Sequence, residues 1–119
     1  MIFIVDDDAA TRDSLRLLLE AVGFEAREFA GGGPFLDGVR PADGDCLILD
    51  LNMPGMNGFD VLAELRRRGA GLPVIVVTAH ADPATRSRAA AGGALAVLEK
   101  PHRTSELLAL VRRALAIGL

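Results

Sequence analysis

The sequence Ile2-Phe3-Ile4-Val5-Asp6-Asp7-Asp8 joins four consecutive apolar residues to three aspartates. A short apolar run without polar alternation is typical of a strand that is buried on both faces of a sheet. Three similar runs follow along the chain, at residues 46–49, 74–77 and 94–98. A fifth stretch at residues 25–29 is more polar, and we expect it to form an edge strand.

Amphipathic stretches separate these runs and predict helices. Two of the helices are expected to be short, at about residues 34–39 and 83–91. Asp7 or Asp8 can cap the first long helix, and Thr104 or Ser105 can cap the last. The three long helices are expected to pack through apolar positions at helical spacing, which are Leu15, Leu18, Leu19 and Val22; Phe59, Leu62 and Leu65; and Leu108, Val111 and Leu115.

Strands and helices therefore alternate five times, which predicts an α/β fold. The expected architecture is a doubly wound, five-stranded parallel sheet with right-handed crossovers and helices on both faces. A length of 119 residues suits one domain, and we expect residues 1–119 to form it without a second domain in this chain. In such sheets the ligand site lies beyond the carboxyl ends of the strands.

Composition narrows the class of protein further. The net charge of −3 gives no electrostatic reason to expect direct nucleic-acid binding. No apolar run approaches the length of a membrane span, so we expect a soluble, cytoplasmic domain without a membrane partner. The single cysteine, Cys46, excludes an intrachain disulfide and is expected to be a small core residue. Lys100 is the only lysine among 13 basic residues.

The residues that end the predicted strands share one kind of chemistry. Asp6 and Asp7 follow the first strand, Asp50 the third, Thr78 the fourth and Lys100 the fifth. Carboxylates crowded at one sheet edge repel one another, so a proton or a cation must neutralise them. Oxygen donors without histidine or cysteine favour Mg²⁺, or alternatively Mn²⁺. A carboxylate nucleophile with a lysine and a hydroxyl indicates phosphoryl transfer to an aspartate.

These residues resemble the response-regulator receiver domains of two-component signalling, which have a flavodoxin-like fold. The resemblance covers about residues 2–117, and its closest likeness is to the receivers of FixJ/NarL-type transcription factors. It rests on four motifs at the right strand ends and in the right order, which are Val5-Asp6-Asp7, Leu49-Asp50-Leu51-Asn52-Met53-Pro54-Gly55-Met56-Asn57-Gly58, Val77-Thr78-Ala79 and Glu99-Lys100-Pro101.

The resemblance implies a role for each site residue. Asp50 would be the phosphoacceptor, and the carboxylates of Asp6, Asp7 and Asp50 would hold the metal ion together with the main-chain carbonyl of Asn52. Thr78 would hydrogen-bond the phosphoryl oxygen, and Lys100 would pair first with Asp50 and then with the phosphoryl group. The remaining expected neighbours of the phosphoryl site are Ala79, which leaves room, His80, which either tunes hydrolysis or is a plain loop residue, and Pro101, which follows a cis peptide bond.

The resemblance also implies a signalling partner and a switch. A sensor histidine kinase would supply the phosphoryl group, and phosphorylation would draw Thr78 and Lys100 toward it. The surface of the fourth helix, fifth strand and fifth helix would then repack, control dimerisation, and act on transcription through a partner or a missing DNA-binding domain. Val97 stands at the switch position where an aromatic residue is usual, and a valine cannot swing between exposed and buried rotamers as an aromatic residue does.

Two other function classes compete with this interpretation. One is a stand-alone or degenerate receiver that acts only as a protein-binding module, which the substitution at Val97 keeps open. The other is a Mg²⁺-dependent phosphohydrolase with an aspartate nucleophile. Such enzymes usually carry a second acid two residues after the nucleophile and a cap domain, and here that position is Asn52. We therefore expect a phosphoacceptor signalling domain and not a turnover enzyme.

Overall fold

The computed structural model describes residues 1–117 and contains five strands that alternate with five helices. The strands are β1 (Ile2–Val5), β2 (Ala26–Phe29), β3 (Cys46–Asp50), β4 (Val74–Thr78) and β5 (Ala96–Glu99). The helices are α1 (Ala9–Ala21), α2 (Gly32–Gly38), α3 (Gly58–Arg67), α4 (Pro83–Ala91) and α5 (Thr104–Ile117). In this part of the chain, no helix is long and apolar enough to cross a membrane.

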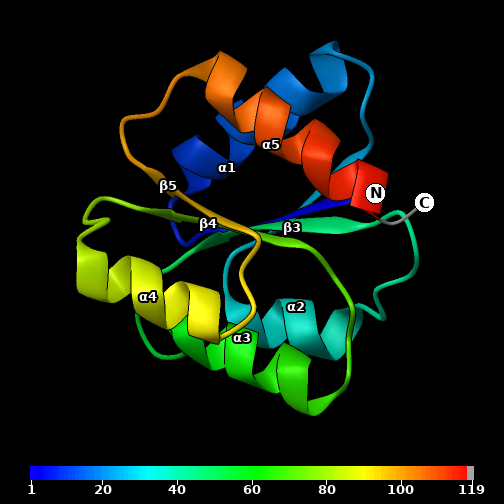
Figure 1. Ribbon diagram of the computed structural model, residues 1–119. Coiled ribbons are helices and arrows are strands. Elements are labelled where there is room, and N and C mark those ends of the chain that lie inside the picture. Colours follow the sequence, from blue (N-terminus) through cyan, green and yellow to red (C-terminus); the bar gives the residue numbers. More distant parts are fainter. Residues whose placement is uncertain (118–119) are drawn as a thin grey trace.

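All strand pairs are parallel, and the strand order is β2-β1-β3-β4-β5. Figure 1 shows the sheet as the middle layer, with α1 and α5 on one face and α2, α3 and α4 on the other. This arrangement is the doubly wound α/β sheet that the sequence predicts. It brings the carboxyl ends of β1 and β3, which are 44 residues apart in sequence at Asp6 and Asp50, to neighbouring positions at one edge.

Alternation along the strands divides the core into two layers. In β1, Phe3 and Val5 pack toward α2 and α3, while Ile2 and Ile4 pack toward α1 and α5. The same alternation holds in β3, β4 and β5. Because successive side chains of a strand point to opposite faces, the face of each residue just beyond a strand end follows from its position in the sequence.

The structure corrects one strand prediction. The run at residues 94–98 was expected to be buried on both faces, but β5 begins at Ala96 and lies at an edge of the sheet. Ala96 and Val97 are only half-buried, whereas Leu98 is buried. A run of apolar residues indicates a strand, but it does not indicate whether that strand lies at the edge or in the middle of the sheet.

Three predictions for the helices are also wrong in detail. Val22 was expected on the apolar face of the first helix, but α1 ends at Ala21 and Val22 is 43% exposed. The last helix was expected to be capped by Thr104 or Ser105, but Thr104 is already helical and the carbonyl of Arg103 accepts the N–H of Leu107. The apolar face of α5 was expected to include Leu108 and Leu115, but the buried residues are Leu107, Val111 and Ala114, and Leu108 and Leu115 are only partly buried.

The other helices agree closely with the sequence pattern. Asn57 caps α3, and its side chain and that of Asp60 exchange hydrogen bonds with each other's main-chain N–H groups, as in a capping box. Asp82 caps α4, whose first residue is Pro83. The short α2 was expected at residues 34–39 and is found at Gly32–Gly38. Cys46 is fully buried, as expected, and burial raises the pKa of its thiol to about 12.

Candidate functional site

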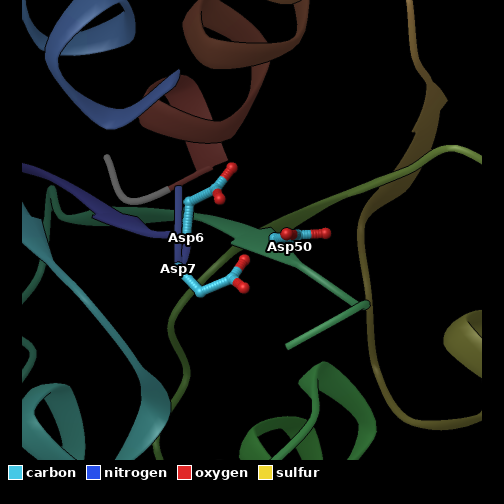
Figure 2. Close-up of side chains that lie close together, drawn as sticks. All are labelled: Asp6, Asp7 and Asp50. Atoms are coloured by element: carbon cyan, nitrogen blue, oxygen red, sulfur yellow. The ribbon is translucent and has the colours of Figure 1, made fainter. Parts of the chain in front are cut away.

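Three aspartates form an acidic cluster at the carboxyl edge of the sheet. Asp6 and Asp7 follow β1, and Asp50 is the last residue of β3. One carboxylate oxygen from each lies within 4.8 Å of the others. Figure 2 shows Asp6 and Asp7 next to each other, with both side chains extending toward the side on which Asp50 lies. Asp6 and Asp50 are 3% and 5% exposed, and Asp7 is exposed at the mouth of the cluster.

Strand register explains why these side chains meet. Val5 pairs with Leu49, so Asp6 and Asp50 occupy adjacent positions one residue beyond that pair. Both continue the face of the sheet whose apolar residues contact α1 and α5. Asp8 is not part of the cluster. It directly precedes α1, as expected for a cap, but its side chain makes no capping hydrogen bond to a main-chain N–H and instead accepts from the Thr11 hydroxyl at 2.5 Å.

The Asp50 carboxyl lies in a poorly solvated environment. Burial raises its pKa above the ordinary value, and the charges of Asp6 and Asp7 raise it further. Two interactions act in the opposite direction, namely the main-chain N–H of Asn52, which donates to Oδ1 at 3.1 Å, and the positive charge of Lys100. The main chain of Asn52 therefore fixes one Asp50 oxygen in place and leaves Oδ2 to face other groups.

Lys100 lies between two carboxylates of the cluster. Its Nζ atom is 3.5 Å from Asp6 Oδ2 and 3.8 Å from Asp50 Oδ2. The contact with Asp50 is the expected one, and the closer contact with Asp6 is not implied by the family resemblance. Alternation accounts for both, because Lys100 follows Leu98 on the same face of the sheet that carries Asp6 and Asp50. The peptide bond to Pro101 is cis, as expected, and Pro101 is exposed.

Thr78 ends β4 and is 2% exposed. Its Oγ1 accepts hydrogen bonds from the Asn52 side-chain amide at 3.1 Å and from the His80 main-chain N–H at 3.2 Å. Because both neighbours donate, the hydroxyl proton of Thr78 can be donated to a further acceptor. Ala79 and His80 are exposed beside it, so the small side chain of Ala79 leaves space at this end of the site.

Sequence reasoning missed the residues that support the cluster from α1. Arg12 donates from Nη1 to the main-chain carbonyl of Asp6 at 2.8 Å, and its Nε lies 3.4 Å from Glu28 on β2. Glu28 also binds Arg16. This network holds the end of β1 against α1 and places a positive charge behind the acidic cluster. The helical pattern predicts only that Arg12 faces solvent. No local sequence signal therefore identifies its contacts with Asp6 and Glu28.

The donor set of the acidic cluster fits a hard divalent cation. Three carboxylates offer oxygen atoms that are close enough together to bind one ion. Two of these carboxylates are buried, so the repulsion between their charges is costly. Mg²⁺ and Mn²⁺ prefer such oxygen donors and retain water ligands on the exposed side. The exposed position of Asp7 gives the site an open side toward solvent.

The burial of Asp50 leads to a prediction for stability. At pH 7 with a chelator present, Asp50→Asn should raise the free energy of unfolding by on the order of 1 kcal/mol, because it removes a buried charge beside two others. Since the folded-state pKa is raised, the ionised carboxyl opposes folding at pH 7, and its penalty disappears below the usual value of 3.8.

Urea unfolding at pH 7 and at pH 3 measures this difference, and the gain of the variant should be present only at the higher pH. Asp43→Asn is the matched control, because Asp43 is an exposed loop residue. A variant that is less stable than the unmodified chain at pH 7 would contradict the prediction.

Comparison with known proteins connects this geometry to a family. A family model described as "Response regulator receiver domain" matches residues 2–112. The transcriptional regulatory protein FixJ of Azorhizobium caulinodans is 40% identical over 114 residues, which are 96% of this chain and 54% of that protein. The response regulator protein TodT of Pseudomonas putida is 36% identical over 118 residues, which are 99% of this chain and 52% of that protein.

Solved structures give the same result. The response regulator StyR superposes with a TM-score of 0.91 at 38% identity, over 98% of this chain and 59% of that chain. The structure titled FixJ-N superposes with a TM-score of 0.86 at 31% identity, over 97% of this chain and 92% of that chain. This chain spans about half the length of the curated relatives it matches.

Proposed function

Because the chain belongs to the response regulator receiver domain family, we propose that its Asp50 accepts a phosphoryl group from the phosphohistidine of a sensor histidine kinase. Receiver domains of response regulators are signalling domains that pair with such kinases. The observation that carries the proposal is the position of Asp50, whose buried carboxyl ends β3 beside the Asp6 carboxylate and shares the Lys100 ammonium with it.

In the proposed reaction, an Asp50 carboxylate oxygen attacks phosphorus while the bond from phosphorus to the donor imidazole nitrogen breaks. An acyl phosphate forms, and the donor histidine leaves in its neutral form after taking up a proton. The Lys100 ammonium is close enough to Asp50 to follow the negative charge onto the phosphoryl oxygens. The Thr78 hydroxyl donates to one of those oxygens, and the exposed Ala79 leaves space for the group.

The acidic cluster supplies the metal site in this proposal. The carboxylates of Asp6, Asp7 and Asp50 and the main-chain carbonyl of Asn52 would hold Mg²⁺ or Mn²⁺. The bound cation would neutralise the charge that the carboxylates and the incoming phosphoryl oxygens bring together. Arg12, which binds the Asp6 carbonyl, keeps the first of these ligands in position.

Phosphorylation would then act on α4, β5 and α5. A phosphoryl group adds nearly two negative charges at pH 7, and movement of Thr78 toward it would pull the loop between β4 and α4. Converting a rare conformation into the dominant one needs about 5 kcal/mol of differential stabilisation. A few charge-assisted hydrogen bonds, each worth about 1.5–3 kcal/mol, are of that order. The residue at the switch position on β5 is Val97, which is not aromatic, so an aromatic rotamer change is not part of this switch.

Intact mass after incubation with phosphoramidate and Mg²⁺ tests the proposed function. The chain should gain one labile phosphoryl group, and Asp50→Asn should gain none. Omission of Mg²⁺ should abolish the gain in the unmodified chain. Absence of any phosphoryl gain under these conditions, in a chain whose circular dichroism shows it folded, would refute the proposal. Multiple rapid turnovers of a phosphate ester would instead favour a phosphohydrolase.

We further propose that this domain acts on transcription, as the name of a relative indicates for that protein. FixJ from Azorhizobium caulinodans is named as a transcriptional regulatory protein, and this chain matches only 54% of it. The receiver would control a DNA-binding segment or a partner through dimerisation on the surface of α4, β5 and α5. Size-exclusion chromatography with and without beryllofluoride measures this, and a monomer in both conditions would contradict it.

A further inference from the structure

Both main-chain polar groups of Ala81 are held by charged side chains. Its N–H donates to Glu99 Oε2 at 2.9 Å, and its carbonyl accepts from Arg86 Nε at 2.9 Å. Glu99 is the last residue of β5 and Arg86 belongs to α4, so the two side chains reach Ala81 from different elements. Ala81 is 8% exposed, which makes the loss of either partner costly for its main chain.

The same loop is tied to β5 at a second point. The main-chain N–H of Lys100 donates to the carbonyl of Thr78 at 2.8 Å, and Thr78 pairs with Glu99 in the sheet. Glu99 and Lys100 are consecutive and therefore face opposite sides of the sheet. The carboxylate of Glu99 points to the side of α4, while Lys100 reaches Asp6 and Asp50 on the other side. The consecutive residues Glu99 and Lys100 thus contact both the loop between β4 and α4 and the acidic cluster.

Arg86 extends this connection into α4. Its Nη1 atom donates to the main-chain carbonyl of Val97 at 3.3 Å, so its guanidinium bridges the loop and β5. Apolar packing contributes little here, because Ala89 is the buried residue of α4. Figure 1 shows α4 at the outer side of its layer, near the β5 edge. Arginine contacts therefore carry a large share of the attachment of α4 to the loop and the sheet.

We propose that Glu99 and Arg86 are positioning residues for phosphorylation at Asp50, because together they fix residues 78–81, and hence the Thr78 hydroxyl, relative to Lys100. This inference rests on the proposed function. The hydrogen bonds of Glu99 and Arg86 to Ala81 connect the site to α4. Arg86 also binds the main-chain carbonyl of Val97, so this connection does not use the Val97 side chain. Preorganised donors accelerate a reaction because no reorganisation is needed when charge develops.

The test compares Glu99→Ala with Glu99→Gln in the full chain. Glu99→Gln keeps an oxygen acceptor for the Ala81 N–H, whereas Glu99→Ala removes it. Amide hydrogen exchange, measured by NMR, should show that Ala81 exchanges about tenfold faster in Glu99→Ala and near the original rate in Glu99→Gln. The phosphorylation rate with phosphoramidate should fall about tenfold in Glu99→Ala and be largely retained in Glu99→Gln.

Two controls separate positioning from a general loss of structure. The Mg²⁺ affinity, measured by calorimetry, should change less than twofold in Glu99→Ala, because the acidic cluster lies on the other side of the sheet. Arg88→Ala removes a different contact of α4, in which Arg88 lies over the Phe59 ring, and should leave both the Ala81 exchange rate and the phosphorylation rate unchanged. Arg86→Ala removes the bond to the Ala81 carbonyl and leaves the Ala81 N–H bonded to Glu99, so it should lower the phosphorylation rate, and an unchanged rate would overturn the role of Arg86.

The outcomes are distinct for the two proposals. Unchanged Ala81 exchange and phosphorylation in Glu99→Ala would overturn the positioning role, and so would an equal loss in Glu99→Gln. A chain that gains no phosphoryl group in any form would contradict the proposed function. In that case the proposed role of Glu99 in phosphorylation is also overturned, even if the Ala81 amide exchanges faster in Glu99→Ala.

Discussion

Replacing Gly58 by alanine is expected to destabilise the protein by about 3 kcal/mol, at the upper end of the usual cost of overpacking. Gly58 is the first residue of α3 and is buried. A Cβ atom on it would lie 2.8 Å from the main-chain carbonyl oxygen of Asp50 and 2.8 Å from Leu51 Cα. Because these are main-chain atoms, no change of a side-chain rotamer relieves the contact.

The same substitution is expected to impair the site as well as the fold. The Gly58 N–H donates to the Leu51 carbonyl at 3.1 Å, so α3 starts directly beneath the segment that carries Asp50. To accept a methyl group, either α3 or the end of β3 must shift. A shift of β3 would change the distance from Asp50 to Lys100, and we expect the rate of phosphorylation by phosphoramidate to fall at least tenfold.

Urea unfolding followed by circular dichroism and intact-mass kinetics measure these two effects. Gly33→Ala is the matched control, because Gly33 lies in α2 and a Cβ atom there would meet nothing within 4 Å. In a helix this exchange should be neutral or stabilise by about 0.5–1 kcal/mol. An unfolding midpoint for Gly58→Ala equal to that of the unmodified chain would show that the end of β3 accommodates the methyl group without cost.

Lys100→Arg is expected to preserve folding stability and to reduce the phosphorylation response about tenfold. The ammonium of Lys100 lies between Asp6 and Asp50, at 3.5 Å and 3.8 Å from one oxygen of each. A compact ammonium on a flexible stem can follow charge from the Asp50 carboxylate to a phosphoryl group. A planar guanidinium keeps the positive charge but binds carboxylates in a fixed forked geometry, and is therefore expected to remain paired with Asp6 or Asp50.

The measurements are urea unfolding, phosphorylation rate and the NMR shift of the Thr78 amide on addition of beryllofluoride and Mg²⁺. Lys100→Ala should lose both stability and response, because three carboxylates then remain without the nearby cation. Arg103→Lys serves as the control for the reverse exchange, since Arg103 is exposed. A full beryllofluoride shift and an unchanged phosphorylation rate in Lys100→Arg would show that charge alone is sufficient at this position.

Much of the fold and of the site could be predicted from local patterns. Apolar runs without alternation identified the buried strands β1, β3 and β4, and Gly, Pro and Asn residues marked the helix boundaries near Asn57 and Pro83. The strand-end rule then selected Asp6, Asp50 and Lys100, which the structure brings together. These predictions succeed because they depend on the conformation of a few consecutive residues and on one general rule for parallel sheets.

The unsuccessful predictions concern relations between distant segments. The half-buried edge position of β5 depends on the strand order, which apolarity alone does not specify. The buried face of α5 is displaced from the predicted one, because the exact angle at which a helix meets a sheet selects among neighbouring leucines. Arg12 looked like an ordinary solvent-facing helix residue, and only the packing of α1 against β1 and β2 brings it to Asp6 and Glu28.

The sequence by itself determined which residues end the strands and what chemistry they carry. It did not determine how the single lysine is shared between Asp6 and Asp50, nor that Glu99 and Arg86 hold Ala81 from two elements. Periodicity is a local property of the chain and is visible in its letters. Strand order, register and the approach of α4 are long-range properties, and they fix these contacts only when the whole sheet and its two helical layers have assembled.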